Sequence, residues 1–297
     1  PIYSNPFSET SAEIAIGENP QFNIRNHYFF NNKRNWYLES TVKAEYTDIS
    51  VYNENLKKSG LYNQKHFSFE VKANKLITGN FTAGIGSRYE YLKYSPEIET
   101  FPRVYGKINF LTGFVDLHFN NLNSPSYPNS GNIIDFEAGV NYNQHPDFKY
   151  DDGNSATPQS SPLFSKKAYY SIKYYSAHYL PIHKHSLFFK LHSGVHFGNK
   201  QPFLNDFIVG GNDLVIRNQI LFPGFRTNSI FSSSVIAPQV GLHYSVTKKL
   251  VVTATSSFLK YDFIKSNIII DENHGNSSVW GVALAAGYRS FIGPLEA

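Results

Sequence analysis

The residues of this chain best suited to chemistry are two arginines in one stretch, IVGGNDLVIRNQILFPGFRT, at positions 208–227. A guanidinium carries a planar fork of donors that can hold a carboxylate through two hydrogen bonds. Arg217 lies in the middle of this stretch and Arg226 near its end. Two short motifs flank them: a Gly-Gly element at Gly210 and Gly211, and an aromatic motif at Phe222, Pro223, Gly224, Phe225 and Arg226. These residue types predict a binding or bracing role, with no catalytic residue among them.

Other residues of catalytic or metal-binding type lack the spacing that such sites need. The His-Lys-His run at 183–185 falls where a turn is expected, so we interpret it as a solvated turn rather than a metal site. His192 and His196 fall on the polar face of one strand, which suits a lining at least as well as a ligand role. The segment GIGSR has the wrong spacing for a nucleophile elbow. We therefore expect no catalytic, cofactor-binding or metal-binding residue in this chain.

Composition excludes several further classes. The chain has 297 residues and no Cys, so it has no disulfide framework and no thiol chemistry. Its 27 basic and 23 acidic residues give a formal charge of +4, which is too weak to predict nucleic-acid binding. No apolar run reaches the length of a membrane-spanning helix. The chain also has no Met, from which we expect it to be a piece of a longer polypeptide.

Most of the chain alternates apolar and polar residues, as β-strands do. The clearest examples are KHFSFEVKAN (65–74), NIIDFEAGVNYN (132–143), HSLFFKLHSGVHF (185–197) and VWGVALAAGYRS (279–290). About fourteen such segments occur, each matching the roughly 9–11 residues of a tilted membrane-crossing strand. No window shows the apolar stripe and caps of a helix. In 281–287 the small residues predict room for neighbouring bulk or for bending of the sheet.

Two all-β architectures fit this pattern. In a transmembrane antiparallel β-barrel, the apolar face meets lipid, the polar face lines the lumen, and Tyr-rich strand ends such as 87–95 and 166–181 sit at headgroup level. In a large soluble all-β protein the apolar face would be a packed core, and the mean hydropathy of -0.34 fits both. We expect the barrel, as one domain over 1–297, with about sixteen strands, of which fourteen or fifteen belong to this chain. The alternation shifts near Gly113, where a bulge is expected.

Inside a barrel, the aromatic motif predicts a stiff loop tip. Pro223 fixes φ and Gly224 permits a tight reversal, so Phe222 and Phe225 would wedge against lumen-facing side chains. Arg226, with Arg217 as a second candidate, would then pair with a carboxylate on the inner wall. The sequence does not identify that carboxylate. The alternative is a surface loop tip with a solvated arginine.

The order of these motifs resembles the C-terminal part of the BamA-type surface-antigen barrel superfamily. In that family a Gly-Gly element precedes a long loop that folds back into the lumen and carries an Arg-Gly-aromatic motif. Three other segments resemble family segments in the same order: the Asn-rich hairpin at 120–142, PFLNDFIVGG at 202–211 and GYRSFIGPLEA at 287–297. The resemblance covers about 105–297 and implies an outer-membrane barrel of a Gram-negative bacterium.

The aromatic motif departs from the family pattern, because Pro223 stands where the family has arginine. The variant Phe-Pro-Gly-Phe resembles the type found in barrels that follow a patatin-like phospholipase, particularly in Bacteroidetes. That resemblance implies a barrel that anchors, and helps to place, an N-terminal lipid acyl hydrolase, whose catalytic residues would lie upstream. The implied partners are outer-membrane lipid and that periplasmic hydrolase domain, with a homodimer left open and no cofactor. The alternatives are an assembly or translocation factor and a passive porin-like channel.

Overall fold

The computed structural model describes residues 2–5, 7–17, 19–52, 58–98, 103–151, 165–199, 201, 205–211, 217–225, 230–247, 249–264, 277–290 and 293–296. Regular structure in these residues is entirely β, as the alternating pattern predicted. Within the same residues there is no helix with the length and apolarity needed to cross a membrane.

Fourteen strands form one antiparallel sheet, and each strand pairs with its neighbours along the chain, except that β10 pairs with β14. The strands are β1 (Ile2–Asn5), β2 (Ser8–Ala15), β3 (Gln21–Phe29), β4 (Trp36–Tyr52), β5 (Lys58–Thr78), β6 (Phe81–Ile98), β7 (Arg103–Asn120), β8 (Gly131–Asp151), β9 (Tyr169–Ile182), β10 (His185–Gly198), β14 (Ser234–Ser245), β15 (Leu250–Tyr261), β16 (Ser277–Ser290) and β17 (Gly293–Glu296). This number agrees with the fourteen or fifteen strands expected for the chain.

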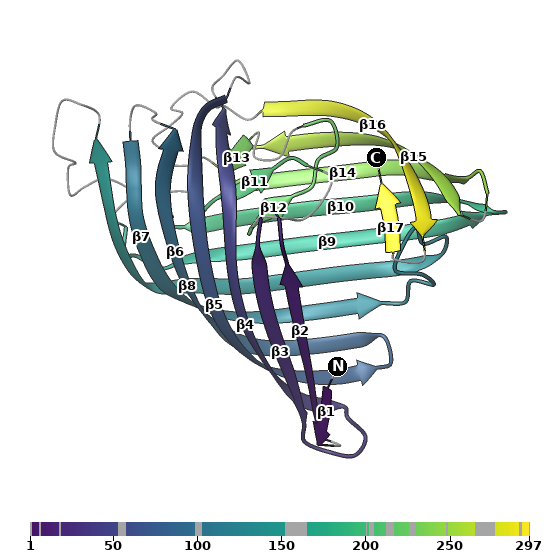
Figure 1. Ribbon diagram of the computed structural model, residues 1–297, viewed down its shortest axis with the longest axis horizontal. Helices are drawn as coiled ribbons and strands as arrows, with labels where there is room; N and C mark the ends of the chain where they lie inside the picture. The colour runs from purple at the N-terminus through teal and green to yellow at the C-terminus, as the bar shows by residue number, and fades with distance from the viewer. Residues whose placement is uncertain are drawn as a thin grey trace.

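A second sheet of three short strands is formed by residues between β10 and β14. Its central strand β11 (Phe207–Val209) pairs in parallel with β12 (Gln219–Ile220) and antiparallel with β13 (Ile230–Ser232). Figure 1 shows the large sheet curling round, with the small sheet on its concave side. Within the described residues the outer edges of β1 and β17 have no partner strand, so hydrogen bonds do not close the curled sheet into a complete barrel.

The two faces of the large sheet reverse the pattern of a soluble protein. On β5, Phe67 and Phe69 point outward and are 40% and 43% exposed, whereas Ser68 between them points inward and is 8% exposed. Large apolar side chains are exposed in the same way on most other strands, and Trp280 and Leu284 of β16 reach 74% and 80%. A sheet with an apolar outer face and a polar interior matches the side-chain pattern of a transmembrane β-barrel.

The connections between strands differ in length at the two rims. Two-residue turns at 79–80 and 183–184 lie at one rim, together with the turn at 121–130. The strand ends at the other rim are separated by the longest stretches of sequence, at 152–168, 199–233 and 262–276. This asymmetry is typical of outer-membrane barrels, which have short periplasmic turns and longer external loops. His183 and Lys184 form one of the short turns, where the sequence predicted a turn, and His185 begins β10.

The bulge expected near Gly113 lies elsewhere. The register between β7 and β8 shifts between Asn109 and Leu111, where β8 supplies extra residues around Asn143, which has a φ of 53°. Pairing at Gly113 itself is regular. The apolar–polar alternation breaks in this region because Phe110 and Phe114 are apolar residues that point inward and are buried.

Candidate functional site in the barrel lumen

Residues 201–233 are called here the lumen loop, and the parts of it that the structure describes carry the small sheet and pack against the inner wall of the large sheet. Ile208 joins a buried apolar layer with wall residues such as Leu92 and Phe110. Phe207, Val209 and Phe222 form a second layer with wall residues that include Val235 and Leu259. The described parts of the loop therefore fill part of the lumen with packed apolar side chains.

The Gly-Gly element and the aromatic motif lie against each other. The N–H of Gly210 donates to the carbonyl of Ile220, and the N–H of Gly211 donates to the carbonyl of Phe225, both at 3.1 Å. Gly210 and Gly211 have φ values of 128° and 81°, which L side chains rarely adopt. The sequence therefore needs glycine at both positions to bring the two motifs together.

The tip of the lumen loop packs on the inner face of β16. Phe222 is fully buried, and its ring lies 5.2 Å from that of Phe225. A Cβ added at Gly281 would lie 2.7 Å from the carbonyl oxygen of Pro223 and 3.0 Å from Cε1 of Phe222. Glycine at 281 is therefore required by this close contact, which is the neighbouring bulk that the small residues of 281–287 predicted.

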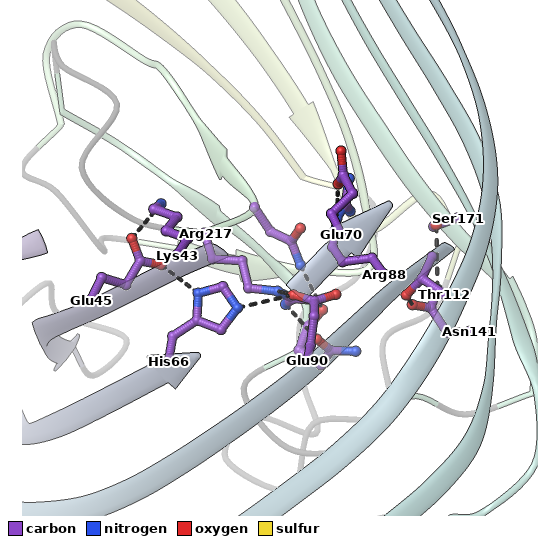
Figure 2. Close-up of polar contacts among 12 residues, drawn as sticks. Lys43, Glu45, His66, Glu70, Arg88, Glu90, Thr112, Asn141, Ser171 and Arg217 are labelled. Atoms are coloured by element: carbon purple, nitrogen blue, oxygen red, sulfur yellow. Dashed lines mark hydrogen bonds and ion pairs between the residues drawn. The ribbon is translucent and has the colours of Figure 1, made fainter. Parts of the chain in front are cut away.

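Arg217 is the arginine that the structure places against an acidic residue of the wall. Its Nε donates to Oε1 of Glu90 at 2.5 Å and its Nη2 donates to Oε2 at 3.3 Å, while Nη1 donates to Asn205. Figure 2 shows this contact between loop and wall. Although burial disfavours the charged form, the Glu90 carboxylate raises the pKa of the Arg217 guanidinium, so Arg217 stays charged. Arg226, our first candidate, lies outside the described residues.

Glu90 belongs to a chain of charged side chains across neighbouring strands (Figure 2). Nε2 of His66 lies 3.2 Å from Oε1 of Glu90, and Nδ1 of His66 lies 2.6 Å from Oε1 of Glu45. Lys43 forms an ion pair with the other oxygen of Glu45. From the wall to the loop, basic and acidic side chains therefore alternate in the order Lys43, Glu45, His66, Glu90 and Arg217.

A second group of charges on the wall is centred on Arg88. Its guanidinium donates to Glu70 and to Glu137, both at 2.7 Å, and Lys173 lies 3.2 Å from Glu137. Arg88 also lies over the ring of Phe114, 4.6 Å from its centroid. Nearby, Thr112 donates to Asn141 and Asn141 donates to Ser171. Pairing of this kind satisfies charges that are shielded from water.

Asp206 is a buried carboxyl within the lumen loop. Its side chain accepts a hydrogen bond from Gln201. Burial, with a further contribution from the nearby Asp262, raises the pKa of the Asp206 carboxyl to about 7. The docked loop therefore holds this carboxyl largely in its neutral form below pH 7.

A second segment enters the lumen from the short-turn rim. In the turn at 121–130, called here the Tyr127 turn, the carbonyl of Tyr127 accepts a hydrogen bond from Arg289 at 3.0 Å. The carbonyl of Pro128 accepts one from Ser186, also at 3.0 Å. A Cβ added at Gly287 would lie 2.8 Å from Cε1 of Tyr127. The inner face of β16 therefore receives both inward segments, at Gly281 and at Gly287.

Two cavities remain beside these segments. One of about 280 Å³ is lined by polar groups that include His118, Asp135, Glu137 and Lys173. The other, of about 260 Å³, lies between the Tyr127 turn, the tip of the lumen loop and β16. Across the residues that the structure describes, no three His, Asp or Glu side chains are grouped as metal ligands. The arrangement is suited to holding segments in place.

Sequence reasoning missed the wall side of this site. Glu90, His66 and Arg88 stand at polar positions of alternating strands, so their inward direction was readable. Which of them face each other depends on strand register, which a single sequence does not give. Tyr127 lies in the Asn-rich hairpin at 120–142 that resembles a family segment, but that resemblance assigned no contact to it.

Comparison with known proteins agrees with this architecture. The family model for the OMP85 superfamily matches residues 8–297. The solved structure of BamA from Haemophilus ducreyi lacking POTRA domains 1–3 has a TM-score of 0.63 and 14% identity, covering 94% of this chain and 57% of that one. CdiB from Acinetobacter baumannii has a TM-score of 0.54 and 10% identity, covering 92% of this chain and 44% of that one. This chain thus spans about half the length of these structures. No curated protein sequence matches it.

Proposed function

Because this chain belongs to the OMP85 superfamily, we propose that it is an outer-membrane barrel domain, spanning residues 1–297, that anchors a further domain of the same polypeptide. The superfamily places the chain in the outer membrane of a Gram-negative bacterium. The strand pattern, with apolar side chains toward lipid and charges toward the lumen, agrees with that location. The anchoring role extends beyond this family assignment.

The observation that carries the proposal is the pairing of Arg217 with Glu90. The two residues are 127 positions apart, and the pair fixes the lumen loop to β6 on the wall. Both side chains are shielded from water, with 12% and 3% exposure. We infer that this pair braces the loop, that the loop stabilises the curled sheet, and that a rigid barrel serves as an anchor.

The domain that we propose it carries is a patatin-like lipid acyl hydrolase. The support is the Phe-Pro-Gly-Phe motif at 222–225, which resembles the variant found behind such hydrolases. All catalysis would then belong to residues outside this chain. A homodimer of the anchored protein remains a prediction.

An assembly or translocation factor is the second candidate, and membership of the OMP85 superfamily together with the BamA-like fold favours it. A passive channel fits less well. The lumen loop and the Tyr127 turn both occupy the lumen, and an open pore would need them to be displaced.

Intact mass and N-terminal sequencing of the protein from outer-membrane fractions test the proposal. A product about twice as long as this chain, beginning with a hydrolase domain and releasing fatty acid from phospholipid vesicles, is the expected result. Tandem small periplasmic domains without hydrolysis would point to the assembly factor. A product little longer than this chain that conducts ions in planar bilayers would refute the anchor and support a channel.

A further inference from the structure

Two basic side chains, one from the loop and one from the wall, lie close to the same carboxylate oxygen. Oε1 of Glu90 accepts from Nε of Arg217 at 2.5 Å and lies 3.2 Å from Nε2 of His66 (Figure 2). Arg217 comes from the lumen loop, whereas His66 and Glu90 belong to the wall. If the loop left the wall, Glu90 would keep His66 as its neighbour and lose Arg217.

The two nitrogens of His66 are in different situations. Nδ1 lies 2.6 Å from Glu45, and because a carboxylate oxygen only accepts, Nδ1 carries the hydrogen of that bond. Nε2 is buried and has no partner that meets hydrogen-bond geometry, although it lies close to Glu90. The hydrogen bond to Glu45 therefore needs only the proton on Nδ1, and Nε2 is the site at which His66 takes up a second proton, directed at Glu90.

The charges around His66 show when that second proton is needed. With the loop docked, Lys43 and Arg217 balance Glu45 and Glu90, so a neutral His66 leaves this group uncharged. The neighbouring Arg88 on β6 is occupied by Glu70 and Glu137. Without Arg217 the group has one negative charge in excess. A buried carboxylate without a counterion is strongly unfavourable.

We propose that His66 is a positioning residue that acts through Glu90 as the replacement counterion for Arg217, so that release of the lumen loop is coupled to uptake of one proton at Nε2. This inference rests on the proposed brace. Histidine suits this role because its charge changes between about pH 5 and 8. By linkage, if proton uptake accompanies release, then acid favours release.

Asp206 would act in the opposite direction and has to be removed from the measurement. Burial raises the pKa of this loop carboxyl to about 7, so the docked loop retains a proton that the released loop loses. Because Gln201 already donates to the Asp206 side chain, Asp206→Asn keeps an acceptor for that bond and removes the titration. His192 and His196 of the wall also contact the loop, because His192 Nδ1 accepts a hydrogen bond from the N–H of Leu221 and the His196 ring stacks on Phe207, so both can take up protons when the loop leaves. All proton-linkage measurements are therefore made with Asp206→Asn, His192→Asn and His196→Asn, which leaves His66 as the histidine under test.

Thiol labelling of the full-length protein in outer-membrane vesicles measures release. Residues 1–297 contain no Cys, so Val209→Cys places a single buried thiol of the barrel on β11 of the loop. Its maleimide labelling rate, divided by that of the denatured protein at the same pH, gives the equilibrium constant for opening. Protein without the added cysteine gives the background. Ser186→Cys, buried on β10 beneath the Tyr127 turn, reports opening that is not confined to the lumen loop.

The expected result is that opening at Val209→Cys rises by up to tenfold for each unit of pH decrease, and that Ser186→Cys does not follow. His66→Asn keeps a donor near the position of Nδ1 but cannot take a proton, so it should abolish this slope. An unchanged slope in His66→Asn overturns the inference while leaving the brace intact. If Arg217→Met does not increase opening at any pH, the brace itself is wrong.

Discussion

Replacing Arg217 with methionine removes the charge of the brace while keeping most of the side-chain length. Glu90 is 3% exposed, so the substitution leaves a carboxylate with little access to water. Breaking a buried ion pair by removing one partner destabilises by about 3–5 kcal/mol. His66 lies 3.2 Å from Glu90 and can offset part of this loss, which favours the lower end, about 3 kcal/mol.

The labelling of Val209→Cys at pH 8 measures this loss as a change in loop opening. A change of about 3 kcal/mol corresponds to an increase of roughly a hundredfold in the opening constant. Adding Glu90→Gln removes the isolated charge, so the double variant should open less than Arg217→Met alone. That rescue separates an electrostatic brace from loss of packing against Phe110, whose ring lies 5.5 Å from the guanidinium.

Arg34→Met is the matched control on the surface of the same sheet. Arg34 pairs with Glu9, but its side chain is 43% exposed, so its loss should change stability by less than about 1 kcal/mol. The reasoning fails if Arg217→Met and Arg34→Met have equal effects, or if Glu90→Gln gives no rescue.

Three further predictions follow from the contacts inside the lumen. Gly281→Val should displace the loop tip and destabilise the barrel by about 1–3 kcal/mol in urea unfolding, because the added side chain would collide with the Pro223 carbonyl and the Phe222 ring. The control Gly79→Ala, whose added methyl group has no neighbour within 4 Å, should have little effect. Tyr127→Ala should lower the temperature at which the folded barrel unfolds on gels and increase ion conductance, and unchanged values would refute a role for that turn. The docked state holds Asp206 protonated, with a pKa of about 7, so the free energy of loop docking should weaken by up to about 4 kcal/mol as pH rises from about 4 through 7. In Asp206→Asn, the maleimide labelling of Val209→Cys should no longer show this pH dependence.

The strands and their two faces were predictable from the sequence, because period-two alternation shows which side of the sheet each side chain faces. Phe67 and Phe69 point outward and His196 points inward, as their positions in the pattern required. The alternation near Gly113 misled us, because Phe110 and Phe114 are apolar residues that point inward and are buried. Phe110 packs in one layer with Ile208 of the loop, and Phe114 lies beneath the guanidinium of Arg88.

The candidate site was only half predictable. The Gly-Gly element, the aromatic motif and an arginine directed at a carboxylate were all readable in one stretch of sequence. The contact of Arg217 with the wall was not, because it depends on where the loop places that side chain relative to β6; Arg226 lies outside the described residues. Glu90 was unreadable as the partner for the same reason: 127 residues separate it from Arg217, and only the curled sheet brings the two together.

The contacts on the inner face of β16 also bear on the order of folding. Neighbouring strands are joined mostly by local connections, so the sheet can grow one hairpin at a time with little loss of chain entropy. The bond between Arg289 and Tyr127 spans 162 residues and cannot form until that growth has curled the sheet round. We therefore expect insertion of the strands to precede filling of the lumen, so that a newly inserted barrel is transiently hollow.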